Sequence, residues 1–179
     1  MLDGEIKLIK DAVRGKSSAF GPLYDHYQPM IYRFVVVKVS RREDAEDITH
    51  QVFLSAWQNI RSYKNLGHPF SSWLYQIARN QVIDHYRAKK SETSLEKIDP
   101  DYFVLPAAAH FDVGTKLEIE KVRAGMLKLK SEYQDVVVMR FIEDLPIKEV
   151  ARIIGKTEGA VKLMQHRAIK ELRDILEQQ

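Results

Sequence analysis

The chain has 179 residues, of which 45% are hydrophobic and 30% charged, a composition typical of a folded globular protein. It contains no cysteine, which excludes disulfides, thiolate catalysis and zinc sites with cysteine ligands. A net charge of +3 does not by itself indicate a nucleic-acid partner, and no apolar run approaches the roughly 18 residues that a membrane helix needs. We therefore expect a cytoplasmic, soluble protein with no membrane insertion of its own.

Apolar residues recur at helical spacing through most of the chain, which predicts an all-α fold. The runs VVVKV (35–39) and VVVM (136–139) favour strands by β-branching, but each lies within a longer helical pattern and is assigned to helix. Residues 89–116 are polar, contain two prolines and lack periodicity, so they are predicted to be a flexible linker. The sequence thus predicts two small helical domains, residues 1–88 and 117–179.

The first informative element is a helix predicted over residues 40–60, with Ser40 and Glu43 as a capping box at its start. Its buried stripe comprises Ala45, Ile48, Val52, Phe53 and Ala56. A different face carries Asp44, Asp47, Gln51 and Leu54. Carboxylates near a helix N-terminus stabilise the helix dipole, which accounts for the acids but not for Gln51 beside an exposed leucine.

Residues 63–71, YKNLGHPFS, form a predicted loop whose rings offer a pocket for a flipped base. The next helix has an inner stripe of Leu74, Ile77, Ala78 and Val82. Its outer stripe comprises Gln76, Arg79, Asn80, Ile83 and Arg87, flanked by Trp73, Tyr75 and Tyr86. Rings stack on bases, amides read base edges and arginines hold phosphates, so this set indicates single-stranded nucleic acid. The alternative is that Trp73 and the tyrosines close the core of a small domain.

Residues 145–173, LPIKEVARIIGKTEGAVKLMQHRAIKELR, fit a helix-turn-helix. Pro146 suits the first turn of one helix, Gly155 ends that helix, and Thr157 caps the next. The second helix has a predicted buried side of Val161, Met164, Ala168, Leu172 and Ile175. The opposite side carries Lys162, Leu163, His166, Arg167, Lys170 and Arg173.

The N-terminal part of such a second helix enters the major groove of DNA. Lys162, His166 and Arg167 are therefore candidates for base edges or phosphates, and Leu163 for a thymine methyl group. The alternative is a helical hairpin with a solvated lysine-rich face, which the acids Glu158, Glu171 and Asp174 favour.

Glu46 and His50 lie four residues apart on one helical face, as metal ligands often do, which would suit a catalytic metal site. No second ligand pair is visible, so a solvent-facing pair is the default, and we predict no metal, no cofactor and no catalytic residue. A metal-dependent enzyme thus stays the weaker alternative. Another is a repressor or activator that binds duplex DNA through the helix-turn-helix alone.

Three blocks together resemble the bacterial extracytoplasmic-function (ECF) sigma factors of RNA polymerase. These blocks are DAEDITHQVFLSAW (44–57), FSSWLYQIARNQVIDHYR (70–87), and the helix-turn-helix with EGAVK (158–162) and HRA (166–168), in the family's order. The resemblance implies an alternative sigma factor, not an enzyme, that binds core RNA polymerase and directs promoter-specific transcription initiation. It would read duplex DNA at the −35 element and single-stranded DNA at the −10 element, and would assist melting. An anti-sigma factor, often membrane-anchored in this family, is the further partner implied.

Carried over by position, residues 1–88 correspond to sigma region 2 and residues 117–179 to region 4, with the linker threading through polymerase. The implied polymerase-binding residues are Asp44, Glu46, Asp47, Gln51 and Phe53. The implied −10 residues are Tyr63, Lys64, His68, Phe70, Trp73, Gln76, Arg79, Asn80 and Arg87. The implied −35 residues are Thr157, Lys162, Leu163, His166 and Arg167.

Two departures from the family pattern bear on these assignments. His50 and Gln51 stand where glutamine and glutamate are usual, which removes a negative charge from the polymerase-binding block. Leu163, Met164 and Gln165 replace a frequent Ser-Arg-Leu, so one common polar contact becomes apolar. We therefore expect that the −35 sequence read by this helix can differ from the family's usual motif.

Overall fold

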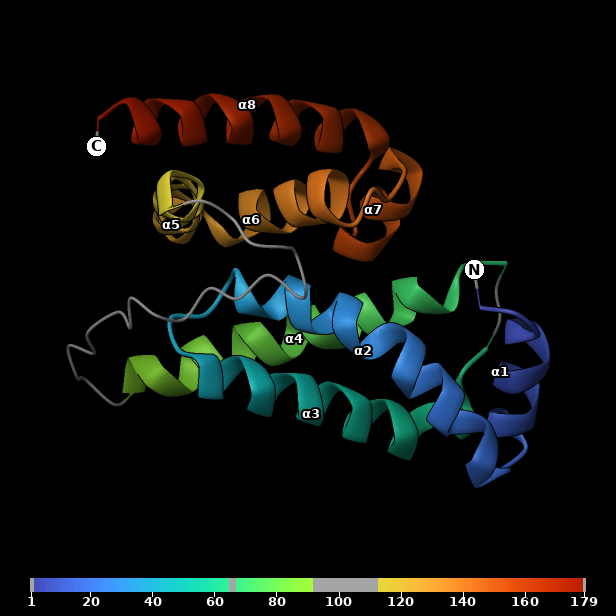
Figure 1. Cartoon of the computed structure of the whole chain (residues 1–179). Coiled ribbons are helices and arrows are strands. Elements are labelled where there is room, and N and C mark those ends of the chain that lie inside the picture. The colour runs from blue at the N-terminus through green and yellow to red at the C-terminus, as the bar shows by residue number, and fades with distance from the viewer. Residues whose placement is uncertain (1, 65–66, 92–112, 179) are drawn as a thin grey trace.

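The computed structural model describes residues 2–64, 67–91 and 113–178, and its helices form two groups (Figure 1). The first group, here called the N-terminal unit (residues 2–91), contains α1 (Glu5–Val13), α2 (Phe20–Val36), α3 (Arg42–Asn59) and α4 (Phe70–Ser91), with 3-10 turns η1 (Ser17–Ala19) and η2 (Ile60–Ser62). The second group, the C-terminal unit (residues 113–178), contains α5 (Val113–Lys128), α6 (Ser131–Val137), α7 (Ile147–Ile154) and α8 (Glu158–Glu177), and a π-helical turn, η4 (Val138–Ile142), extends α6. No strand occurs in the described ranges, and the prediction of an all-α fold with two small helical domains is confirmed.

The N-terminal unit is built around α2, α3 and α4, which pack against one another, while α1 packs across α2 and η2. The stripe predicted for the helix at 40–60 is buried at every position, from Ala45 to Ala56. Leu74, Ala78 and Val82 of α4 are also buried, and Ile77 packs against the core from its edge. Each large apolar side chain buried in this way stabilises the fold by roughly 1.5 to 3 kcal/mol.

The two valine runs avoid strand structure, as predicted. Val35 and Val36 end α2, residues 37–39 leave it in a turn, and the VVVM run continues from α6 into η4. Burial decides this outcome, because the valines fill the helical core of each unit and their β-propensity is only a weak preference.

Two sequence-based details are corrected at helix ends. The capping box of Ser40 and Glu43 is wrong: α3 begins at Arg42 after the N-cap Arg41, whose side chain forms no capping hydrogen bond. A capping box needs the serine at the N-cap, and Ser40 lies one residue too early for that. Pro146 is itself the N-cap of α7 and not a residue of its first turn.

The predicted helix-turn-helix is present in the C-terminal unit, where α7 packs against α8. Gly155 ends α7 with φ 69°, a left-handed conformation that a glycine adopts without strain. Thr157 Oγ1 accepts a hydrogen bond from the Ala160 N–H at 3.2 Å and so caps α8. At Gly125 of α5 a Cβ atom would lie 2.9 Å from Leu172 Cδ1, so the missing side chain lets α5 and α8 approach closely.

The two units are in contact, with α4 packed against α7. In Figure 1, α8 lies on the side of the C-terminal unit that is turned away from α2, α3 and α4. Helix α4 extends to Ser91 and α5 begins at Val113, each reaching past the edge predicted for the linker. The remaining linker residues, 92–112, lie outside the described residues. Among the helices that the structure describes, none combines the length and apolar character that crossing a bilayer requires.

Candidate nucleic-acid interface

The predicted −35 residues share one exposed face of α8. Lys162, Leu163, His166 and Arg167 are all solvent-exposed, and Leu163 keeps 49% of its surface accessible. Val161 and Ala168 are fully buried on the opposite side, where Met164, Leu172 and Ile175 also pack against the core. The predicted division of this helix into an inner and an outer face is confirmed. Its outer face is an apolar residue among cations, which suits a DNA groove lined by phosphates.

Gln165 is not part of that face. Its Oε1 accepts a hydrogen bond of 3.1 Å from Arg140 Nε, and Arg140 Nη1 also donates to the carbonyl of Leu145. Gln165 therefore links α8 to η4. It does not supply DNA with the polar contact that is lost by having leucine at position 163.

The predicted outer stripe of α4 divides into two sides. Gln76, Asn80 and Arg87 are exposed, and Arg87 Nη1 pairs with Asp84 of the same helix at 3.1 Å. Tyr75 was predicted to flank this stripe, and that is wrong: it is fully buried, with its ring 5.5 Å from that of Phe34 in α2. Tyr86 is 43% exposed, but its hydroxyl donates to the carbonyl of Lys38.

The rings of the predicted −10 loop form a cluster at the start of α4. The ring centroids of Tyr63, Phe70 and Trp73 lie between 5.0 and 5.4 Å apart. Phe70 is buried and also approaches Tyr27, so it supports the others from below. Trp73 is half-buried, so this one ring both closes the core and keeps an accessible part.

The rest of the predicted loop pocket is only partly described. Lys64 is exposed and His68 is half-buried, while residues 65 and 66 lie outside the described residues. The pocket for a flipped base therefore stays a prediction.

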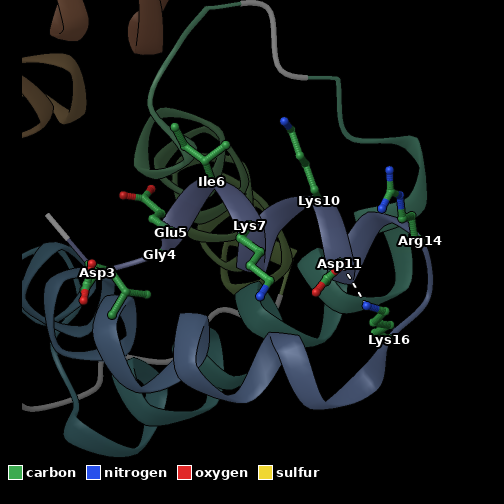
Figure 2. Close-up of a pocket in the computed structure, with 10 residues that line it drawn as sticks. Asp3, Gly4, Glu5, Ile6, Lys7, Lys10, Asp11, Arg14 and Lys16 are labelled. Atoms are coloured by element: carbon green, nitrogen blue, oxygen red, sulfur yellow. Dashed lines mark hydrogen bonds and ion pairs between the residues drawn. The ribbon is translucent and has the colours of Figure 1, made fainter.

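Helix α1 adds an unpredicted wall to this neighbourhood. Tyr63 lines a cavity of about 230 Å³ together with α1 residues that include Ile6, Lys10 and Arg14. Figure 2 shows Ile6 and Lys10 on the same side of α1, whereas Lys7 and Asp11 point to the opposite side. No local sequence pattern predicts this placement, because α1 is brought close to the loop by the packing of the whole unit.

Arg79 turns from the stripe toward the C-terminal unit. Its Nε lies 2.8 Å from Asp135 Oδ2, and Lys38 Nζ lies 2.5 Å from the other oxygen of the same carboxylate. Burial lowers the pKa of the Lys38 ammonium from its ordinary value, while Asp135 opposes that shift. Sequence reasoning missed Lys38 and Asp135, although each is a charge attached to an apolar run, in VVVKV and DVVVM.

Further polar contacts join the units within the described residues, and the sequence reasoning missed these also. Arg33 of α2 donates from Nε and Nη2 to the two oxygens of Glu143, at 2.7 and 2.9 Å. Ser71 and Ser72, at the start of α4, both donate to Glu149 Oε1, at 3.2 and 2.9 Å. In these two contacts, as at Asp135, the N-terminal unit supplies the donors and the C-terminal unit the carboxylate. Arg123 of α5 instead donates to the carbonyl of Ser40, at 3.4 Å.

The predicted polymerase-binding residues on α3 do not all share one surface. Asp47 and Gln51 are exposed beside Leu54, which is 40% accessible, and Glu46 pairs with Arg42 at 2.7 Å on the exposed side. Asp44 was assigned to the same acidic face, but it turns toward α4, where Lys89 Nζ lies 3.0 Å away and His85 Nε2 3.5 Å away.

Phe53 lies in the core, with its ring 4.8 Å from that of Tyr24. Its place under the exposed residues allows it to support a surface but not to form one. As for the metal-site alternative, no group of three or more His, Asp or Glu side chains suited to hold a metal occurs among the described residues.

Comparison with known proteins places these surfaces in a family. The family model for Sigma-70 region 2 matches residues 23–92, and the model for Sigma-70, region 4 matches residues 119–172. The ECF RNA polymerase sigma factor SigW of Bacillus subtilis is 32% identical over 181 residues, covering 93% of this chain and 94% of SigW. The chain belongs to the ECF RNA polymerase sigma factors.

A second relative agrees with that placement, and two solved structures share the fold. The ECF sigma factor BldN of Streptomyces coelicolor is 33% identical over 174 residues, which cover 96% of this chain but 65% of BldN. CnrH in complex with the cytosolic domain of CnrY has a TM-score of 0.73 at 23% identity, over 97% of this chain and 96% of that chain. The sigma factor RpoE of Bartonella quintana, in complex with the anti-sigma factor NepR, has a TM-score of 0.70 at 20% identity, over 88% and 96%. At these identities the two structures establish the shared fold.

Proposed function

We propose that the protein is an alternative sigma factor that binds core RNA polymerase and directs transcription initiation at particular promoters. The observation that carries this proposal is that one chain holds two candidate DNA-facing helices, α4 and α8, in the two matched regions. A simple helix-turn-helix regulator needs only α7 and α8. The polymerase performs the chemistry, and the sigma factor chooses the site and helps to open it.

Recognition of the −35 element is assigned to α8. Lys162 and Arg167 supply positive charge toward the phosphates or base edges of the major groove, and His166 lies between them on the same face. Leu163 offers an apolar contact to a thymine methyl group. Thr157 caps the helix end that enters the groove and so supports its geometry.

Recognition of the −10 element is assigned to α4 and the loop before it. Gln76 and Asn80 lie one turn apart on the exposed side, where their amides are free to read the edges of unstacked bases. Trp73 and Tyr63 offer ring surface at the start of the helix, and Lys64 and Arg87 offer charge to the strand. Bases held in this way stabilise the melted strand relative to duplex.

Binding to polymerase is assigned to the exposed side of α3. Asp47, Gln51 and Leu54 form its centre, an accessible leucine beside a carboxylate and an amide. Exposed Glu46 lies next to them, whereas Asp44 and Phe53 hold α3 in place from behind. We place this function in the cytoplasm, where polymerase works.

An inhibitory partner completes the proposal. The solved RpoE relative is bound to an anti-sigma factor. We propose that this chain is likewise inhibited by an anti-sigma protein. An inducing signal would cause that protein to dissociate and so free the sigma factor.

The test is run-off transcription on genomic DNA fragments with purified core polymerase, read by sequencing of the RNA 5′ ends. We expect transcripts that require the added protein and whose start sites share upstream −35 and −10 motifs. Silence across all fragments, together with failure to bind core polymerase in a pulldown, contradicts the proposal. Duplex binding without any transcription would point to the simpler helix-turn-helix regulator.

A further inference from the structure

The contact between the two units centres on one carboxylate. Asp135 of α6 is fully buried, and its two oxygens are held by Lys38 at 2.5 Å and Arg79 at 2.8 Å. Lys38 is only 1% exposed to solvent. Its Nζ also donates to the carbonyl and hydroxyl oxygens of Ser131, at 3.3 and 3.4 Å. The C-terminal unit thus covers a lysine that belongs to the N-terminal unit.

Lys38 and Arg79 are brought together by the N-terminal unit itself. Lys38 follows the end of α2, and its carbonyl accepts a hydrogen bond from Tyr86 of α4, two turns after Arg79. Without the C-terminal unit, two cations would therefore stand side by side on the N-terminal surface. Two cations close enough to share one carboxylate repel each other, so the pair favours an anion between them.

Two other carboxylate contacts between the units have the same polarity, whereas Arg123 of α5 donates in the reverse direction, to the carbonyl of Ser40 at 3.4 Å. Arg33, Ser71 and Ser72 donate from the N-terminal unit, and Glu143 and Glu149 accept from the C-terminal unit. Buried ion pairs gain little over the same groups separated in water, because each charge must give up its hydration. Buried apolar side chains of both units belong to one core, so the contact also has an apolar part, but its charged part adds little to the free energy of closing.

Arg79 connects this interface to the proposed −10 surface. It directly precedes Asn80 in α4, and 23% of its side chain is still accessible. Guanidinium and ammonium groups bind phosphate oxygens with the same geometry and charge preference that they show for a carboxylate. Asp135 therefore occupies the position that a phosphate beside Asn80 would need.

We propose that Lys38 and Arg79 form a binding site for a backbone phosphate of the opened DNA strand, which Asp135 occupies in the free chain. The inference rests on the proposed function and adds to it a phosphate site that is hidden while the units are in contact. Strand binding on α4 and contact between the units then exclude each other. By linkage, each must weaken the other by the same factor.

The test uses the full chain and a fluorescent single-stranded oligonucleotide of mixed sequence, with affinity read by anisotropy over a series of salt concentrations. Asp135→Asn keeps the size of the side chain but removes its charge. We expect this variant to bind the oligonucleotide about tenfold more tightly, as a charge-assisted contact becomes available. The slope of log K against log salt should steepen by about 0.7 for each added phosphate contact.

Glu132→Gln is the matched control, because Glu132 lies on the same helix and pairs with Lys156 inside the C-terminal unit. It should leave both affinity and slope unchanged. Lys38→Met in the Asp135→Asn background should cancel the gain and the added slope. If it does not, Lys38 is only a core lysine and the inference is wrong.

Opening of the units is measured separately from DNA binding. The chain has no cysteine, so dyes on Gln58→Cys of α3 and Lys170→Cys of α8, both exposed, report the distance between the units. Asp135→Asn should lengthen that distance without DNA, and the oligonucleotide should lengthen it in the wild type. A variant that opens but gains no affinity overturns the phosphate site.

The same experiment separates this inference from the proposed function. If the wild type directs transcription with core polymerase but Asp135→Asn leaves oligonucleotide affinity and salt slope unchanged, the phosphate site fails alone. A gain confined to a duplex of the same sequence would contradict the assignment to the opened strand. If no transcription occurs at all, the proposed function itself fails.

Discussion

The two helices proposed to face DNA differ in what surrounds them. Helix α8 packs mainly on α5, α6 and α7 of its own unit, and the whole of its predicted outer face is exposed. Helix α4 packs on α2 and α3 and also on α7 of the other unit. Asp135 of α6, in that same unit, binds Arg79 of the outer stripe of α4. Helical periodicity assigns residues to sides of a helix, but it does not tell which neighbour will cover a side. That neighbour is specified elsewhere in the chain.

The largest expected effect is on α8, whose face is free in the closed chain. Lys162→Ala combined with Arg167→Ala should weaken binding to a duplex −35 fragment about 100-fold, because two charged contacts worth roughly 1 to 3 kcal/mol each are removed. Competition binding to a set of single-base variants will separate the two roles. A base contact relaxes preference at one position, whereas a phosphate contact lowers affinity equally for all sequences.

Lys170→Ala with Arg173→Ala serves as the control, since these exposed cations lie further along the same helix. This pair should cost less, through general electrostatics alone. Equal losses in both double variants would mean that α8 binds as a charged rod without a reading end, which would remove the contrast with α4.

The reach of sequence reasoning follows the same contrast. Within one helix the apolar spacing correctly separated Val161 and Ala168 from the exposed face of α8, and Ala45 to Ala56 from the exposed face of α3. Local turn chemistry correctly placed the ends of the helix-turn-helix at Gly155 and Thr157. These features depend only on residues close together in the chain.

Features that depend on distant segments were missed. Asp44 looked exposed by periodicity but is held by α4, and Tyr75 looked peripheral but packs on Phe34. A charge next to an apolar run, as at Lys38 and Asp135, was the one local sign of the contact between the units. The pairing of Lys38 with Asp135 could not be predicted, because 97 residues separate them along the chain.

The next effect concerns the exposed side of α4. Asn80→Ala should reduce promoter opening by about tenfold, as expected for loss of one directed contact to an unstacked base. Initial binding to the −35 fragment should not change, because Asn80 and α8 belong to different units. Permanganate reactivity of thymines in the −10 region measures the opening. Unchanged reactivity in this variant would remove Asn80 from the proposed site.

Gln81→Ala is the control for that change. Gln81 is the next residue of α4, but its Nε2 donates to Ser55 Oγ of α3, at 3.3 Å, and so faces inward. This variant should keep normal opening unless the fold is disturbed. A loss equal to that of Asn80→Ala would indicate that α4 is merely displaced in both variants.

The smallest effect is a pH response of the covered side of α4. Burial raises the pKa of Tyr75 above its ordinary value of 10.0, and nearby Glu143 adds to the rise, with Arg33 opposing it. If opening partly exposes Tyr75, its hydroxyl loses the proton more easily in the open form. Above pH 10 the closed form should then be disfavoured, by less than the limit of about tenfold per pH unit that one proton allows.

Lys38 acts in the opposite direction below that range. Its pKa is lowered in the closed form by burial, so the closed form holds fewer protons than the open one between that lowered value and the ordinary 10.5. Rising pH through this window favours closing, and above 10.5 Lys38 adds nothing further.

The dye pair on α3 and α8 should therefore show closing up to about pH 10 and opening beyond it. Tyr75→Phe should abolish only the alkaline opening, whereas Tyr24→Phe, an exposed tyrosine of α2, should retain both phases. If the alkaline opening persists in Tyr75→Phe, the opening of the contact between the units depends on the titration of some other group.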